Sequence, residues 1–209
     1  MTSTTRSITQ LTVALHRRDL DALAEPVRLA AAAERAWLAE RRVAHQGLRG
    51  AELAAARQEL RVERERERAA GRLAGTRDLV VARALRVELA ARGWDGQWSA
   101  PRPGAIGPGR RWGSTADRYQ HAEGTARFEA SLTIRLPADL AEQLQRAVYW
   151  QSSAIEHRLQ LLAGRAEHRE EIQRLQADLV TTGDVLRAAV RRAVATPLPE
   201  GASGMLLCP

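Results

Sequence analysis

The chain lacks lysine altogether, and it has one cysteine and few aromatic residues among its 209 positions. All 32 basic residues are therefore arginines, which face 25 acidic residues and give a formal net charge of +7. The lone Cys208 excludes a disulfide within one chain and fits a reducing compartment. No apolar run approaches the roughly 18 residues that span a bilayer, and the first residues lack a signal-peptide core. These absences predict a soluble, cytoplasmic protein that does not enter a membrane.

Residue patterns that support catalysis or metal binding are also missing. None of the five histidines lies four residues from another or three residues after a glutamate, so zinc and di-iron helix signatures are absent. The glycines of 104–111 are not followed by the Lys-Ser/Thr pair of a phosphate-binding loop. No Gly-x-Ser-x-Gly nucleophile motif occurs. We therefore predict a protein that is not an enzyme and that needs neither a metal nor a cofactor.

The composition of residues 1–92 is typical of helices, because alanine, leucine, arginine and glutamate dominate it. We expect a helical or coiled-coil domain here, and therefore a mainly α protein. Apolar spacing predicts helices over 7–24, 25–45, 51–74 and 77–92. Pro26 suits a first helical turn, Thr76 a cap and Gly93 a helix end. The alternating charges of 61–68 nearly cancel, which favours a solvated helix face over a nucleic-acid patch.

Residues 93–126 change in character, with many glycines and prolines and three of the five tryptophans. This composition predicts an irregular linker or loop and a domain boundary. One interpretation is that the arginines and tryptophans of this segment bind nucleic acid by stacking and phosphate contacts. The other, which we favour, is that the tryptophans dock onto the helical domain. The residues concerned are Arg102, Arg110, Arg111, Trp94, Trp98 and Trp112.

The segment Phe128–Leu136 alternates strictly between apolar or small residues and polar ones. A period of two over nine residues predicts a strand with one buried face. It is the only strand that we expect in the chain. A lone strand leaves its backbone donors and acceptors unpaired, so it requires a partner strand. Since no partner is evident in the sequence, we expect a second copy of the protein to supply it, as a homodimer.

Helical periodicity follows the strand from Leu140 to Leu179 and defines a strand-helix-helix region over 127–195. Whether residues 138–180 form one helix or two is open, because Trp150–Ser153 permits a turn without a glycine or proline. A clearer break lies at 181–184, where Thr182 is placed to cap a last helix over Val185–Val194. Prolines and glycines in 196–209 predict a flexible tail.

The segment Ser131–Leu144, with the sequence SLTIRLPADLAEQL, resembles the opening of ribbon-helix-helix DNA-binding proteins. The resemblance implies that strands of two subunits pair and that the ribbon enters the major groove. Ser131, Thr133 and Arg135 would then face base edges, with Arg135 suited to guanine. The family's second helix begins with a polar cap that holds a phosphate. Ser152 and Ser153 are one candidate for that cap, and Thr181–Thr182 is the other if a helical hairpin is inserted.

These observations lead to two functional hypotheses. The first is a dimeric protein that binds double-stranded DNA through Ser131, Thr133, Arg135, Ser152 and Ser153, as a transcriptional regulator or a plasmid or mobile-element accessory factor. The second is a helical coiled-coil scaffold or adaptor without nucleic-acid binding. Residues 1–92 could bind a protein partner in either case. The nearly neutral charge of 128–209, with nine arginines and ten acidic residues, weakens a purely electrostatic form of the first hypothesis.

Overall fold

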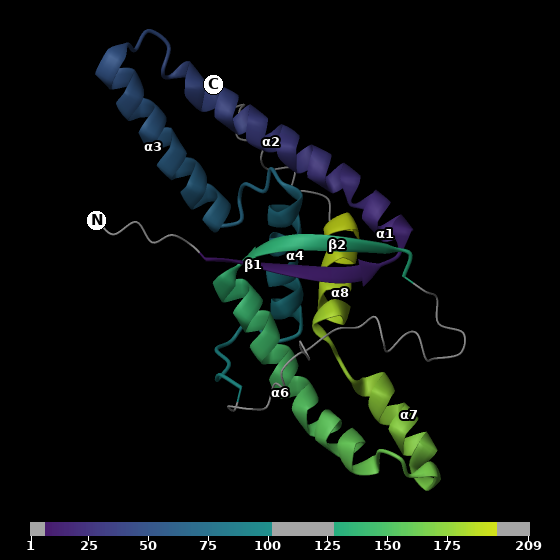
Figure 1. The fold of residues 1–209 in the computed structure, drawn as a ribbon. Helices are drawn as coiled ribbons and strands as arrows, with labels where there is room; N and C mark the ends of the chain where they lie inside the picture. Colours follow the sequence, from purple (N-terminus) through teal and green to yellow (C-terminus); the bar gives the residue numbers. More distant parts are fainter. Residues whose placement is uncertain (1–6, 102–127, 196–209) are drawn as a thin grey trace.

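The computed structural model of the chain describes residues 7–101 and 128–195 (Figure 1). The fold is mainly helical, as the composition predicted, and its described part contains one antiparallel sheet of two strands. The strands are β1 (Ile8–Leu15) and β2 (Ala130–Pro137). Figure 1 shows two helices, α4 and α8, crossing behind this sheet, while long helices extend away from it above and below.

Strand β1 occupies residues that the apolar spacing had predicted to be helical. The prediction of one helix over 7–24 is wrong for its first half, and only the short helix α1 (Arg17–Ala22) follows the strand. The reason is visible in the packing, since Val13 and Leu15 are fully buried beneath the sheet and Leu11 packs against the same core. Alternate apolar residues therefore face one side, and this period-two pattern defines the strand.

The sheet joins the starts of the two described segments, 7–101 and 128–195. Leu11 lies opposite Ile134, and Thr12 lies opposite Thr133. The prediction that β2 has no partner strand within its own chain is thus wrong. Because β1 already occupies that position, strand pairing no longer supports the homodimer, which stays a prediction. The regions 1–92 and 127–195, which we expected to be separate, share one sheet and one hydrophobic core.

The first half of the chain continues from β1 as a helical hairpin and a closing helix. Pro26 lies in the first turn of the helix over Ala24–Val43, where the backbone N–H that proline lacks would have no partner within the helix. Thr76 caps the closing helix by accepting a hydrogen bond from the amide of Leu79 at 3.4 Å. Gly93 follows that helix with φ of +69°, as predicted for a helix end. The helices are α1, α2 (Ala24–Val43), α3 (Gly50–Ala69) and α4 (Arg77–Ala91).

After β2, the second half of the chain also continues as a helical hairpin and a closing helix. Residues 138–180 form two helices, and the break lies at Gly164, whose φ is +79°, rather than at Trp150–Ser153. The last helix begins earlier than predicted, and the hydroxyl of Thr181, not Thr182, accepts the amide of Asp184 at 3.2 Å. The elements are α6 (Ala138–Leu162), the 3₁₀ turn η1 (Ala166–His168), α7 (Arg169–Asp178) and α8 (Thr182–Ala195).

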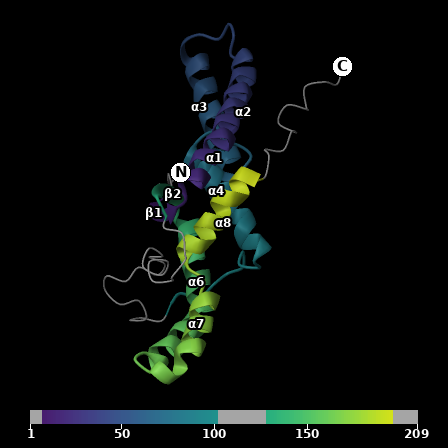
Figure 2. The ribbon, with the colours of Figure 1, turned by 90° about the vertical axis from the view of Figure 1, so that its right-hand side faces the viewer.

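Each half therefore consists of a strand, a helical hairpin and a closing helix. Figure 2 shows the hairpins α2/α3 and α6/α7 projecting from opposite ends of the central core. The closing helices bury residues at the same spacing, six of them at a constant offset of 105 positions. In α4 these are Val80, Val81, Ala82, Ala84, Leu85 and Glu88, and in α8 they are Val185, Leu186, Arg187, Ala189, Val190 and Ala193.

The two halves interlock in the core. Helices α4 and α8 pack against each other, and each also packs on the strand of the other half, α4 on β2 and α8 on β1. The start of α6 adds Leu140 and Leu144 to the same cluster. Neither half has its own core, because its closing helix and its strand contact the other half. The ribbon is consequently held by residues from both ends of the described chain.

Candidate nucleic-acid interface

The outer face of the two-stranded ribbon carries polar side chains. Apart from the exposed Ile8, the strands turn their large apolar residues toward α4 and α8, so alternate residues point away from the core. Ser131, Thr133 and Arg135, which the sequence had singled out, all lie on this outer face. Strand β1 contributes Gln10, Thr12 and Ala14 to it. Gln10, Thr12, Ser131 and Arg135 are exposed, whereas Ala14 and Thr133 are half-buried.

Three cross-strand pairs make up the centre of this face, and the exposed Ile8, opposite Pro137, continues it beyond Gln10. The central pair is Thr12 and Thr133, whose hydroxyl oxygens lie 3.1 Å apart. Gln10 lies opposite Arg135 on one side of that pair, and Ala14 lies opposite Ser131 on the other. Arg135 makes no ion pair with any residue that the structure describes, so its guanidinium is available to an outside ligand. We refer to the six residues of the three pairs as the ribbon face.

Two arginines hold the outer edges of the ribbon. Arg77, at the start of α4, donates a hydrogen bond to the carbonyl oxygen of Thr133 at 3.1 Å. Arg187 of α8 donates to the carbonyl oxygen of Ala14 at 2.9 Å. Arg77 is exposed, but Arg187 is buried, with its guanidinium 4.4 Å above the ring of Phe128. An arginine thus binds a backbone carbonyl at the edge of each strand, but only the arginine at the β2 edge is accessible to solvent.

The end of β1 is fixed by the carboxylate of Glu129. This carboxylate accepts the backbone N–H of Arg17 at 2.9 Å and lies 3.5 Å from Nδ1 of His16. The bond from the Arg17 amide is the main cause that lowers the pKa of Glu129. The side chains of Arg17 and Arg18 are exposed next to this contact. They add positive charge beside one end of the ribbon.

Ser152 and Ser153 lie away from the ribbon face, in the middle of α6. The prediction that they begin a second helix is wrong, because α6 runs through both positions without a glycine or proline to end it. Ser152 is buried and donates a 2.6 Å hydrogen bond to the carbonyl oxygen of Val180. The Ser153 hydroxyl bonds to the carbonyl oxygen of Trp150 at 3.5 Å. Ser152 therefore connects α6 to the segment before α8.

The starts of the two closing helices differ in accessibility. Thr76 and Arg77 at the start of α4 are exposed. Thr181 and Thr182 at the start of α8 are buried, and both the amide and the hydroxyl of Thr181 donate to Oδ2 of Asp184. An anion can reach the first of these helix starts, but the second is covered. Thr181 therefore caps α8, but the start of this helix is buried and a phosphate cannot reach it.

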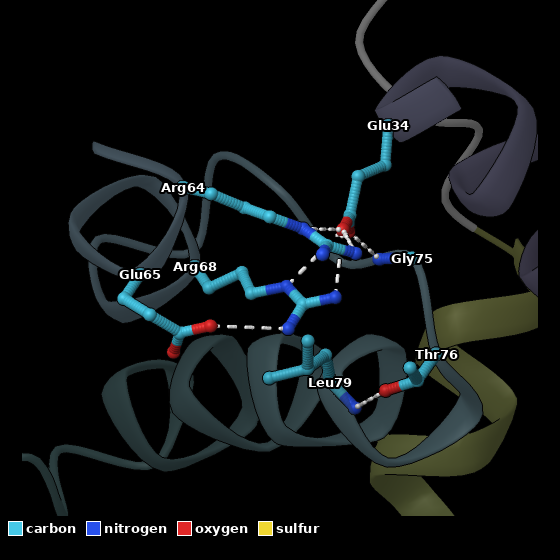
Figure 3. Close-up of polar contacts among 7 residues, drawn as sticks. All are labelled: Glu34, Arg64, Glu65, Arg68, Gly75, Thr76 and Leu79. Carbon is cyan, nitrogen blue, oxygen red and sulfur yellow. Dashed lines mark hydrogen bonds and ion pairs between the residues drawn. The ribbon is translucent and has the colours of Figure 1, made fainter. Parts of the chain in front are cut away.

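A buried carboxylate braces the first hairpin (Figure 3). Glu34 of α2 is 3% exposed, and it accepts hydrogen bonds at 2.7 Å from Arg64, from Arg68 and from the amide of Gly75. Burial raises the pKa of Glu34, but the hydrogen bonds from Arg68, Arg64 and Gly75 outweigh it, and the net shift is downward. The charged run of α3, a helix that buries no residue, thus braces a neighbouring helix.

The stretch with the tryptophans at the end of the first described segment packs against α6 of the 127–195 region, whereas we had expected it to dock onto the helical domain 1–92. Trp94 is buried in the core, and its carbonyl oxygen accepts bonds from Nε1 of Trp98 at 3.1 Å and from Gln143 of α6 at 3.2 Å. Trp150 of α6 donates from Nε1 to the carbonyl oxygen of Ser99 at 2.9 Å. The remaining residues of that prediction lie outside the described residues, namely Arg102, Arg110, Arg111 and Trp112.

Sequence reasoning missed the β1 half of the ribbon face. The signal was a short repeat, since Leu11–Leu15 reads LTVAL and Leu132–Leu136 reads LTIRL. Both segments place leucine, threonine, a β-branched residue and leucine at the same positions, which is a strand pattern. The helical spacing of Ile8, Leu11 and Leu15 concealed it. A search for similarity to the segment at 132–136 would have located Gln10, Thr12 and Ala14.

Within residues 7–101 and 128–195 there is no cluster of three or more histidine, cysteine or acidic side chains that could hold a metal ion. None of the helices described is long and apolar enough to cross a membrane. Comparison of the chain with models of protein families, with curated proteins and with solved structures found no match.

Proposed function

We propose that this chain binds double-stranded DNA by placing its two-stranded ribbon in the major groove. The observation that carries the proposal is the outer face of the ribbon, where polar side chains from both strands stand above a mainly apolar inner face. The major groove of B-DNA admits a two-stranded ribbon, and it presents hydrogen-bond donors and acceptors along the base edges. An exposed row of hydroxyl, amide and guanidinium groups is complementary to those edges.

The individual side chains suit base contacts. Arginine pairs with guanine through two hydrogen bonds, and glutamine pairs with adenine in the same way. Arg135 and Gln10 lie opposite each other and are both exposed, so they can reach neighbouring bases together. A threonine hydroxyl can form a hydrogen bond with more than one type of base. The hydroxyls of Thr12 and Thr133 lie at the centre of the ribbon face.

Phosphate contacts in this proposal come from arginine side chains beside the ribbon. Arg77 is exposed at the edge of β2, and Arg17 and Arg18 are exposed beyond the end of β1. Arginines at such positions bind backbone phosphates and fix the orientation of a protein on the duplex. The start of α4 adds an accessible helix N-terminus, which attracts anions. Ser152 and Ser153 have no part in this version of the interface, because α6 contains them.

The resemblance to ribbon-helix-helix proteins supports the same function in a modified form. That family uses a ribbon made by two subunits, whereas β1 and β2 here belong to one chain. The helical hairpin α6/α7 lies between β2 and α8, as the alternative with an inserted hairpin required. Because ribbon-helix-helix proteins often serve as regulators, we propose by analogy that this chain is a transcriptional regulator or a plasmid or mobile-element accessory factor.

Fluorescence anisotropy with a labelled duplex tests the proposal. We expect affinity to fall steeply as salt rises, because bound arginines release counterions from DNA. Arg77→Ala should weaken binding to all sequences and reduce the salt slope by about one, and Arg135→Ala should cost about 1–3 kcal/mol on a preferred sequence. Arg174→Ala, at an exposed arginine of the distant α7, is the matched control and should change nothing. Absence of salt-dependent binding at low salt would refute the proposal.

A helical scaffold is the second candidate, and the hairpins favour it. Helices α3 and α7 bury none of their residues. A groove near the tip of the first hairpin is lined in part by Ala44, Leu60 and Val62, which could contact a partner helix. In this case Val62→Asp would abolish partner binding, while Arg135→Ala would leave it unchanged. Co-purification with a defined partner, measured for both variants, separates the two candidates.

A further inference from the structure

The ribbon has an approximate two-fold axis through its central threonine pair. Strand β1 maps onto β2 by adding 121 to each residue number, and this operation converts Thr12 into Thr133. The same operation relates Gln10 to Ser131 and Ala14 to Arg135. The backbone is therefore symmetric about the axis, since pairs at equal distance from the centre exchange with each other. The side chains of the ribbon face are not symmetric.

The two ends of the ribbon face differ in what they can bind. One end carries Gln10 and Arg135, both of which can form paired hydrogen bonds with a purine. The other end carries Ala14 and Ser131, a methyl group and a short hydroxyl. These small side chains allow contact with a thymine methyl or a single hydrogen bond, and they discriminate less between bases. Base recognition is thus concentrated at one end.

The flanks of the ribbon show a second, independent asymmetry. Arg77 on the β2 flank is exposed and available to a phosphate. The arginine that binds the β1 flank, Arg187, comes from a later position of its helix, is buried against Phe128 and forms a 2.5 Å ion pair with Asp184. The N-terminus of α4 is accessible, whereas that of α8 is covered. Of the two arginines that bind the strand edges, only Arg77 can therefore reach a phosphate, while Arg17 and Arg18 add charge beyond the end of β1.

We infer that a single chain recognises a non-palindromic duplex, with most sequence discrimination at the end formed by Gln10 and Arg135. This inference rests on the proposed DNA-binding function and specifies its ligand. Two identical subunits that form a ribbon present two identical ends, and they match a palindromic site. Here both strands come from one chain, so the ends are free to differ and one chain is sufficient for one site.

Selection from a pool of duplexes with a randomised centre tests the inference. The full-length chain is incubated with the pool, bound duplexes are sequenced, and the mass of the complex with the enriched duplex is measured by light scattering. We expect an enriched site without two-fold symmetry that is bound by one chain. An inverted repeat that carries two chains would overturn the inference and leave the proposed function intact. Binding without any sequence preference would also overturn it.

A symmetrised ribbon sharpens the test. The double variant Ala14→Arg with Ser131→Gln gives both ends the same pair of side chains, on positions that face outward. We expect the selected site to change to an inverted repeat of the purine-containing half-site. Affinity for this repeat should rise roughly 5- to 150-fold over wild type for each of the two added side chains that makes a paired base contact.

The matched control is the double variant Gln10→Ser with Arg135→Ala, which makes both ends small. It should lose the sequence preference of the wild type while it keeps salt-dependent binding to unrelated duplexes, because phosphate contacts remain. Circular dichroism confirms that both variants are folded. If the symmetrised variant still selects the wild-type site, the ribbon does not read the bases and the inference is wrong. Failure of every protein to bind at low salt would instead refute the proposed function itself.

Discussion

The two helical hairpins occupy equivalent places in the chain but are fastened differently. The hairpin α2/α3 is held by the buried carboxylate of Glu34, which also binds the amide of Gly75 just before α4. The hairpin α6/α7 is held by an ion pair between Arg158 and Glu171, whose side chains are 51% and 38% exposed. Loss of an exposed ion pair costs little stability, whereas removal of one partner of a buried pair costs several kcal/mol because it leaves a buried charge unpaired.

This difference shows that the same order of elements does not imply the same local stability. The brace at Glu34 couples the first hairpin to α4 and therefore to the start of the helix that packs on β2. In the second hairpin α6 is coupled to the core through its buried residues from Leu140 to Val148 and through Ser152, whereas α7 has no comparable brace within the described residues. We expect local opening to begin in α7, which buries no residue. The following predictions test this comparison between the halves.

The largest effects should come from equivalent core positions in the two strands. Leu15 and Leu136 are related by the offset of 121, and both are completely buried. Leu15→Ala and Leu136→Ala should each lower the free energy of unfolding by about 2–5 kcal/mol, because each leaves a cavity in the shared core. Urea denaturation measures both. A much smaller loss for Leu15→Ala would show that β1 is not an equal member of the core.

Removal of each hairpin's carboxylate should have unequal effects. Glu34→Ala leaves Arg64 and Arg68 without their shared acceptor, and we expect a loss of about 3 kcal/mol in the free energy of unfolding, at the lower end for broken buried ion pairs. Glu171→Ala removes an exposed pair and should cost less than about 1 kcal/mol. Equal losses in denaturant titrations would contradict the difference between the hairpins.

Acid should destabilise the first half through Glu34, and the core through Glu88. Burial by itself raises the pKa of each carboxyl. The hydrogen bonds from Arg68, Arg64 and Gly75 to Glu34, and from Arg92 and Arg192 to Glu88, outweigh this effect, so the net pKa of each carboxyl is lowered. A carboxyl with a lowered pKa in the folded state stabilises the fold above its unfolded pKa, near 4.5, and loses this contribution as pH falls. Thermal melts from pH 7 downward measure the loss.

The variant Glu34→Gln provides the control for this pH dependence. Glutamine has nearly the same shape, but it does not titrate. Its melting temperature should start lower at pH 7 and fall less steeply as the pH is lowered. A variant whose melting temperature falls as steeply as that of the wild type would show that other carboxyls, Glu88 among them, account for the acid sensitivity.

Much of the helical structure could be predicted from the sequence, because its signals are local. Thr76, Gly93 and the apolar spacing of α2 and α4 indicate where helices begin or end without any knowledge of distant contacts. The strand β2 was also predicted, since its alternation extends over nine residues. The outward-facing polar row on β2 followed from that alternation.

The pairing of β1 with β2 could not be predicted in the same way. The segment Ile8–Leu15 satisfies both a helical and a strand spacing, and only its contact with residues about 120 positions later decides between them. The burial of Ser152 and of the start of α8 likewise depends on tertiary packing. The sequence therefore predicted only the half of the candidate site that lies on β2, and not the half on β1.

The pairing between β1 and β2 also determines the order in which the protein can fold. During synthesis β1 emerges first, but its partner strand ends at Pro137, so the sheet cannot form until most of the described chain has been made. Closing so long a loop is entropically costly and slows folding. Until then Leu11, Val13 and Leu15 have no sheet to bury them, and the nascent chain exposes a strand that is prone to aggregation. Chaperone demand during synthesis is thus a consequence of joining the first strand to a distant second one.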